Sequence, residues 1–187
     1  QLMLRWFTGE PENKALAKAW PGVVEAAGLI GSKQVQGRCT ISGNLCNAGP
    51  AADSVPAMVA AGAKAVIQGP KGKRTVPVEA IPVGPGKTSL KKGELVEAII
   101  LPAKKPKSGD AYLRFIPRSE MDIAVVSAGV NLTIDGKGVV TSARVALGAV
   151  APTVLLVDAA ARAIIGSKLD DAALDKLGAA ASAACRP

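Results

Sequence analysis

The clearest absence in this sequence is histidine, since the chain contains none. Its three cysteines, Cys39, Cys46 and Cys185, are far apart and form no CxxC pair. A chain with no histidine and three scattered thiols cannot build the usual zinc site, an iron–sulfur cluster or a Ser-His-Asp triad from its own residues. We therefore expect unreactive thiols and no metal site within this chain.

Aromatic residues are also scarce, with two Trp, two Phe and one Tyr among 187 residues. Proteins that bind single-stranded nucleic acid stack bases on aromatic side chains, so this composition makes nucleic acid a weak alternative. No apolar run approaches the roughly 18 residues of a membrane-spanning helix, and the first residues lack the pattern of a secretion signal. We expect a soluble, cytoplasmic protein.

Positive charge is in excess, with 23 Lys and Arg against 15 Asp and Glu and a net charge of +8. Such a surface favours anionic partners, although solubility alone also explains it. A basic anion-binding or RNA-binding domain would use the following residues: Lys71, Lys73, Arg74, Lys91, Lys92, Lys104, Lys105 and Lys107. Most of them lie in predicted turns, where lysine usually serves solvation, so this alternative is the weakest.

The length of the chain suits one or two domains with a sizeable core. Apolar spacing predicts two short helices over 12–30, interrupted at Pro21, and a third over 55–61 capped by Asp53 or Ser54. A period of two predicts a hairpin from 64–69 and 74–81 and a strand over 95–102, with a loop at 82–94 between them. The chain begins with Gln1 and its last helix has no capping segment, so we expect truncation at both ends.

The basic segment AKKPKSGD, residues 103–110, is interpreted as a junction between two subdomains. Three strands follow over 111–116, 122–134 and 139–150, and the last two are joined at Asp135-Gly136, a strong hairpin signal. Helical spacing returns at 153–166 and at 170–184, where Asp170 is the expected cap. The order predicts an α+β fold with domains at 12–106 and 107–187.

Residues 38–56, RCTISGNLCNAGPAADSVP, carry almost no bulky apolar side chain and are predicted to form a loop. Small side chains let consecutive backbone N–H groups approach a phosphate, and Thr40 and Ser42 add hydroxyl donors. Asp53 could accept hydrogen bonds from ribose hydroxyls. Neither GxxxxGK[ST] nor a GxGxxG after a strand is present, so a structural loop with Asp53 as a helix cap remains an alternative.

Three longer segments, in this order, resemble the FAD-binding medium subunit of the molybdenum-containing hydroxylases, the family of carbon monoxide dehydrogenase and xanthine dehydrogenase. They are GSKQVQGRCTISGNLCNAGPAADSVPAMVAAGAKAVIQGPKGKRTVPVEAI, GPGKTSLKKGELVEAIILP and AYLRFIPRSEMDIAVVSAGVNLTIDGKGVVTSARVALGAVAPT. The resemblance implies a partial FAD-binding subdomain of the vanillyl-alcohol-oxidase, or PCMH-like, kind. An antiparallel sheet with helices, like the C-terminal domain of the CO dehydrogenase flavoprotein, is then expected to follow.

The resemblance also implies contacts with FAD. The family segment TIGGN lies against the FAD pyrophosphate and corresponds here to Thr40, Ile41, Ser42, Gly43 and Asn44, with Ser42 in place of a glycine. Asp53 matches an acid that contacts the ADP part of FAD, Arg114 replaces a basic residue near the cofactor, and Ile30 and Val96 match apolar positions of the site. The family's N-terminal lobe, with its own glycine-rich loop, has no match here.

The resemblance implies a redox relay in which FAD receives electrons from iron–sulfur clusters and passes them to an external acceptor. The molybdenum cofactor would lie in a large partner subunit and the 2Fe–2S clusters in a small one, in a heterotrimer that dimerises. No residue of this chain is expected to act as a catalytic acid or base. The alternative is a flavin-free, non-catalytic fragment that serves as a subunit-interaction module.

Overall fold

The computed structural model of the chain describes residues 14–119 and 121–186. Trp6, Phe7, the unassigned segment 1–11, the first two residues of the predicted helical stretch 12–30 and Pro187 lie outside the described residues. The helices of the first half are α2 Lys14–Ala19, α3 Pro21–Gly28, α4 Lys33–Gln36, α5 Ile41–Cys46 and α6 Ser54–Ala61. The predicted break at Pro21 is confirmed, because α3 begins with this proline at its first turn.

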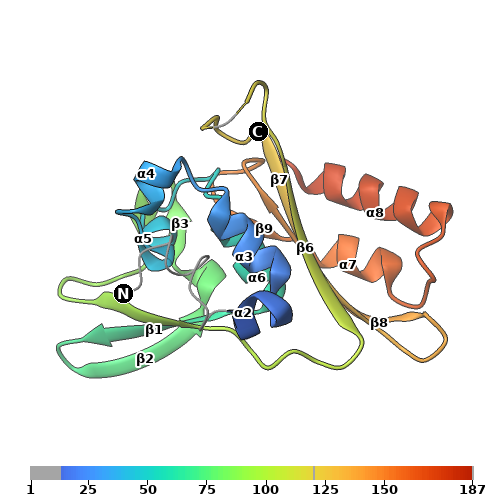
Figure 1. Cartoon of the computed structure of the whole chain (residues 1–187), viewed down its shortest axis with the longest axis horizontal. Helices are drawn as coiled ribbons and strands as arrows, with labels where there is room; N and C mark the ends of the chain where they lie inside the picture. Colours follow the sequence, from blue (N-terminus) through green and yellow to red (C-terminus); the bar gives the residue numbers. More distant parts are fainter. Residues whose placement is uncertain (1–13, 120, 187) are drawn as a thin grey trace.

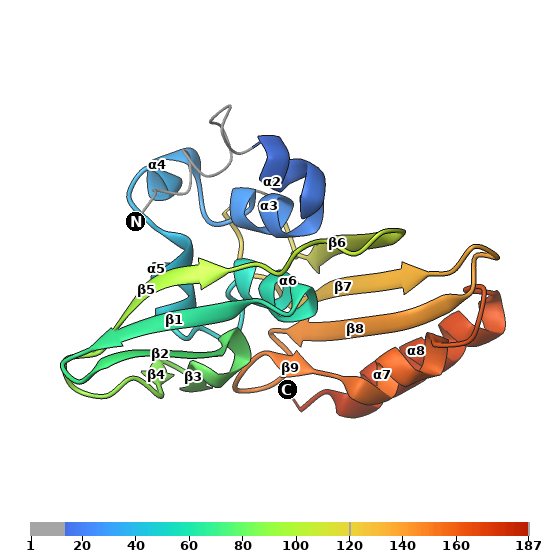
Figure 2. The same ribbon diagram turned by 90° about the horizontal axis from the view of Figure 1, so that it is seen from below.

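The first sheet is antiparallel with the strand order β2-β1-β5 (Figures 1 and 2). Its strands are β1 Lys64–Gly69, β2 Gly72–Pro77 and β5 Leu95–Ile100, and β1 buries Ala65 and Ile67 in the core. The predicted hairpin is therefore confirmed, but β2 is shorter than expected. A 3-10 turn, Val78–Ala80, follows Pro77, which has no N–H to continue the ladder.

The predicted loop at 82–94 is wrong in part, because a small two-stranded ribbon forms there from β3 Pro82–Gly84 and β4 Lys87–Thr88. One backbone hydrogen bond ties the turn of this ribbon to the segment after α5, and a second joins the two residues that flank the ribbon. The Gly86 N–H donates to the Ala48 carbonyl at 3.1 Å, and the Ser89 N–H donates to the Ile81 carbonyl at 2.8 Å. The turn of the ribbon is thereby held beside the residues that follow α5.

The second sheet is an antiparallel meander with the order β6-β7-β8-β9. Its strands are β6 Ser108–Phe115, β7 Val126–Ile134, β8 Val140–Gly148 and β9 Leu155–Leu156, followed by α7 Asp158–Ile164 and α8 Asp171–Ala184. The predicted hairpin is confirmed, but its connection spans residues 135–139 rather than the two residues Asp135-Gly136. Asp135 Oδ1 accepts there from the Lys137 and Val139 amides at 2.7 and 2.9 Å. The predicted cap of the last helix is also confirmed, since Asp170 accepts from the Ala173 amide.

The two halves share one core. Helix α6 lies at the centre of the molecule between the two sheets in both views (Figures 1 and 2), and all eight of its residues are buried. Met58 and Val59 of α6 belong to the same apolar cluster as Tyr112 of β6 and Ala146 of β8. Helices α7 and α8 cover the opposite face of the second sheet (Figure 1). The fold is α+β as predicted, whereas the division at residues 106 and 107 stays a prediction.

Candidate functional site

The predicted loop at 38–56 contains a helix, so this expectation is wrong for residues 41–46. Thr40 lies before the helix in an extended conformation, and its Oγ1 accepts from the Gly43 amide at 2.9 Å. Leu45 anchors the other side of α5, because its side chain is fully buried in the core. The side-chain cap and the buried leucine both stabilise this helix, although the segment is rich in glycine and asparagine.

The helix reduces the number of backbone donors that a ligand could use. Of the five amides expected to face a phosphate, Gly43 N–H donates to Thr40 Oγ1 and Asn44 N–H donates to the Thr40 carbonyl, both at 2.9 Å. Ile41 and Ser42 are the first two residues of α5, and the first amides of a helix have no acceptor within it. These two N–H groups and the adjacent hydroxyls therefore form the donor set at this helix end.

Asp53 does not cap α6 with its side chain. Its two carboxylate oxygens accept from the Tyr112 hydroxyl at 2.9 Å and from Arg114 Nη1, also at 2.9 Å. Both partners of the ion pair are largely buried, with side chains 10% exposed for Arg114 and 12% for Asp53. Burial raises the pKa of Asp53, and the hydrogen bonds from Tyr112 and the charge of Arg114 oppose that shift.

The structure brings most of the predicted site residues around α5. Ile30 packs near Ile41, the Ser54 hydroxyl donates to Asn44 Oδ1 at 2.7 Å, and Arg114 also donates to the Leu29 carbonyl at 3.0 Å. We call these predicted residues the α5 cluster: Ile30, Thr40, Ile41, Ser42, Gly43, Asn44, Asp53 and Arg114. Val96 is buried on the neighbouring strand β5, in the main core against which Ile41 of α5 also packs.

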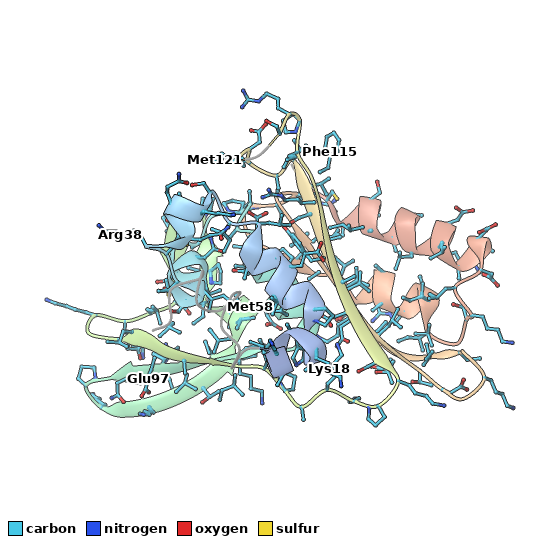
Figure 3. The ribbon with its side chains drawn as sticks, in the orientation of Figure 1. Lys18, Arg38, Met58, Glu97, Phe115 and Met121 are labelled. Carbon is cyan, nitrogen blue, oxygen red and sulfur yellow. The ribbon has the colours of Figure 1, made fainter. Side chains whose placement is uncertain are left out.

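A cleft of about 430 Å³ opens beside the start of α5. Thr40, Ile41 and Ser42 line it on one side, and residues 97–99 of β5 line it on the other. Most of the remaining wall is apolar and includes Met58 of α6 (Figure 3). Neither Asp53 nor Arg114 belongs to this wall. The volume lies within the range of about 300–1,000 Å³ that is usual for small-molecule sites.

Tyr112 is the residue of this region that the sequence analysis missed. It is fully buried, and its hydroxyl holds one oxygen of Asp53, 59 positions earlier in the chain. Burial is also the main reason that the pKa of Tyr112 is raised. A signal was present, because Tyr112 precedes Arg114 by two residues in a predicted strand, and such residues share a face.

The basic residues of the weakest alternative do not form one surface. Five of them, Lys71, Lys73, Arg74, Lys91 and Lys92, line one shallow cleft at the tip of the first sheet, where Glu94 pairs with Arg74 at 2.7 Å. Lys104 instead pairs with Asp110. Within the described part of the chain, no group of three acidic or cysteine residues could hold a metal ion, and no helix is long and apolar enough to cross a membrane.

Comparison with known proteins identifies two regions of this chain. Residues 10–104 match the FAD binding domain in molybdopterin dehydrogenase, and residues 111–187 match the CO dehydrogenase flavoprotein C-terminal domain. The chain belongs to this flavoprotein family. The resemblance expected from the motifs is thereby confirmed, as is the fold class.

Individual members of the molybdenum hydroxylase flavoprotein family are similar over most of this chain. The carbon monoxide dehydrogenase medium chain of Afipia carboxidovorans is 36% identical over 92% of this chain and 59% of its own length. The xanthine dehydrogenase FAD-binding subunit of Escherichia coli O157:H7 is 32% identical over 79% of this chain and 50% of its own. In a solved structure, the reconstituted CO dehydrogenase from Oligotropha carboxidovorans, a chain superposes with a TM-score of 0.91 at 34% identity over 99% of this chain and 63% of that chain. The present chain thus spans between half and two thirds of these relatives.

Proposed function

We propose that this chain is the FAD-binding part of a flavoprotein subunit in a molybdenum-containing hydroxylase. It would bind FAD and relay electrons from the iron–sulfur clusters of a partner to an external acceptor. Membership of the flavoprotein family is the observation that carries this proposal. The chemistry of the α5 cluster supports it, because the start of α5 combines unused amides, hydroxyls and an adjacent cleft.

The FAD diphosphate would be held at the start of α5 by the Ile41 and Ser42 amides and the Ser42 hydroxyl. Helix N-termini favour anions, and a hydrogen bond to a charged group contributes about 1.5–3 kcal/mol. Arg38, an exposed cation two residues before Thr40 (Figure 3), adds positive charge on this side. Thr40, Gly43 and Asn44 would shape the helix end, since their polar groups already support the turn and α6.

The other predicted residues would bind the nucleotide and its surroundings. Each carboxylate oxygen has two lone pairs, so Asp53 can accept from a ribose hydroxyl while it keeps Tyr112 and Arg114. Arg114 would fix this carboxylate and add charge near the cofactor. Ile30 and Val96 would supply apolar packing behind the site. When bound, FAD would supply the electron-transfer chemistry, and the residues of this chain would bind and orient it.

We further propose the partners that such an assembly needs. A large subunit would carry the molybdenum cofactor and a small subunit the 2Fe–2S clusters, in a heterotrimer that dimerises in the cytoplasm. Two curated relatives are named as a medium chain and as an FAD-binding subunit, which supports a multi-subunit arrangement. The hydroxylated substrate would be bound by the large subunit, outside this chain.

Titration of the purified chain with FAD, followed by flavin absorbance and fluorescence, tests the proposal. We expect saturable binding of FAD and much weaker binding of riboflavin, which lacks the diphosphate. Ser42→Asp should abolish FAD binding by charge repulsion, and Ser42→Ala should weaken it. Ser182→Asp, the same change at an exposed position of α8, is the matched control.

Thermal unfolding of each variant shows whether a loss of binding is merely a loss of folding. A wild-type chain that is colourless once unbound FAD has been removed would favour the flavin-free interaction module. Equal binding of riboflavin and FAD would remove the role of the α5 start, and so would an unchanged affinity in a folded Ser42→Asp variant.

A further inference from the structure

A second, polar cavity of about 210 Å³ lies between the second sheet and the segment that connects β5 to β6. It shares no lining residue with the cleft beside α5. Its wall includes Trp20 together with six polar side chains: Lys105, Ser108, Asn131, Thr133, Ser142 and Arg144. No part of the proposed electron relay uses these residues.

The strand register explains why polar side chains gather there. Tyr112, Gly129 and Ala146 pair across β6, β7 and β8, and this row faces the buried helix α6. Since side chains alternate between the two faces of a strand, the residue two positions along β7 lies on the same face. That residue, Asn131, pairs with Arg144.

The next row along this face joins Ser108, Thr133 and Ser142. Helix α6 ends at Ala61, which also lines the cavity, so these polar rows lie where the apolar cover stops. The sheet thus presents an ordered set of amide, hydroxyl and guanidinium groups to the cavity.

One polar atom in this wall has no partner. Asn131 Oδ1 is buried and accepts no hydrogen bond from the residues that the structure describes. A buried polar atom without a partner is costly, and native proteins rarely keep one unless water or a ligand satisfies it. The cavity therefore needs a hydrogen-bond donor at Asn131.

The cations of the wall need the opposite, namely an acceptor. Arg144 donates through Nε and Nη2 to the Val59 carbonyl at 3.1 and 2.9 Å, and through Nη2 to Glu79 at 3.2 Å. Its Nη1 group remains for another acceptor. Lys105 is exposed at the wall and adds a second cation. A ligand that satisfies both groups therefore offers an acceptor to Arg144 Nη1 and a donor to Asn131 Oδ1, and Lys105 favours a ligand with negative charge.

Trp20 supplies the flat apolar part of the wall. Its Nε1 donates to the Pro102 carbonyl at 3.1 Å, and Lys104 Nζ lies 3.8 Å from the ring centroid. Lys104 also forms an ion pair with Asp110 at 2.6 Å, which holds its ammonium group over the Trp20 ring. The indole is thus held rigidly beside the cavity, and its fluorescence can report an occupant.

We propose that this cavity binds a small oxyanion that carries a hydroxyl group, either a hydroxycarboxylate or a phosphate. The anionic oxygens accept from Lys105 and Arg144, and the ligand hydroxyl donates to Asn131 Oδ1. The volume lies below the range of about 300–1,000 Å³ for larger ligands, so a dinucleotide does not fit.

Fluorescence titration of the Trp6→Phe chain, in which Trp20 is the sole tryptophan, tests this inference directly. The probes are inorganic phosphate, glycerate and acetate, and the proposal predicts saturable signals for at least one of the first two. Binding of phosphate alone would identify the ligand as a phosphate, and binding of glycerate alone would identify it as a hydroxycarboxylate. Acetate should bind more weakly, because it has no hydroxyl group for Asn131.

Two further variants and one control connect any binding to the cavity. Lys105→Gln should weaken binding about tenfold, as expected when one charge-assisted hydrogen bond is lost. Asn131→Asp should abolish it by repulsion. Lys107→Gln removes the same charge from an exposed lysine that is not part of the wall, and should leave the affinity unchanged.

Thermal unfolding confirms that each variant is folded, and the anion that binds should raise the midpoint of the wild-type and Lys107→Gln chains but not that of Asn131→Asp. The inference is wrong if no probe gives a saturable signal, which means that the cavity holds water alone. It is also wrong if acetate binds as tightly as glycerate, or if the Lys105 and Lys107 variants lose affinity equally. None of these outcomes depends on flavin, so the test is independent of the proposed redox function.

Discussion

The ion pair between Arg114 and Asp53 is the contact whose removal should show most directly how the two halves are held together. Arg114→Met leaves the Asp53 carboxylate largely buried with one hydrogen bond, from Tyr112. Removing one partner of a buried ion pair usually costs about 3–5 kcal/mol, and the residual 12% exposure of Asp53 argues for about 3 kcal/mol. For a protein of this size, this loss corresponds to a decrease in Tm of roughly 6–12 °C.

Differential scanning calorimetry or thermal unfolding monitored by circular dichroism measures this change. Arg118→Met is the matched control, because Arg118 forms an ion pair of the same length, 2.9 Å, with a side chain that is 81% exposed. An exposed pair contributes at most about 1 kcal/mol, so the control should lose little stability.

The double variant Asp53→Asn with Arg114→Met tests the stated cause of the loss. If the cost comes from an uncompensated buried charge, neutralising Asp53 should recover part of it, and the double variant should lose less than the sum of the two single variants. Additive effects, or equal effects of the Arg114 and Arg118 substitutions, would refute the reasoning.

Two further predictions concern close packing and pH. Gly129→Ala should destabilise the protein by about 1–3 kcal/mol in denaturant unfolding, because the new Cβ would lie 2.5 Å from the Pro56 carbonyl oxygen. Gly109→Ala is the control and should be tolerated, since its Cβ meets nothing within 4 Å. Similar losses of stability in both variants would contradict the close approach at Gly129. The hydrogen bond from Arg74 is the main reason that the pKa of Glu94 is lowered to about 2 from a usual value of 4.5. The pair therefore stabilises the folded state above pH 4.5, and this stabilisation is lost as the pH falls toward 2. The difference in Tm between wild type and Glu94→Gln should therefore shrink over that interval, and a constant difference would show that the ion pair is not its cause.

Local patterns predicted the parts of the fold whose stabilising contacts lie close together in the sequence. The hairpin between β7 and β8 needs alternating side chains and an aspartate that binds amides two and four residues ahead. The cap at Asp170 involves an amide three residues away. Both contacts are made by neighbouring residues, so their residue types were sufficient to predict them.

Helix α5 was not predictable in this way, because glycine, serine and asparagine have low helix propensity. Leu45 stabilises α5 by packing into a core built from distant elements. The same reason applies to the end of β2, after which Val78 N–H donates to the Ala63 carbonyl, and to the ribbon of β3 and β4, whose turn bonds through Gly86 N–H to the Ala48 carbonyl.

The same distinction between local and long-range contacts applies to the candidate site. The sequence alone determined which residues are chemically suited to a dinucleotide, since motif order, small side chains and hydroxyl groups are visible in it. Only the tertiary structure decided that Asp53 pairs with Arg114 and Tyr112 about 60 positions away. It also decided that at least two of the five expected amides are already used, and that Asn131 Oδ1 accepts no hydrogen bond from the described residues. The physical reason is that hydrogen bonding and burial depend on which distant strands meet, and strand pairing is set by the packing of the whole core.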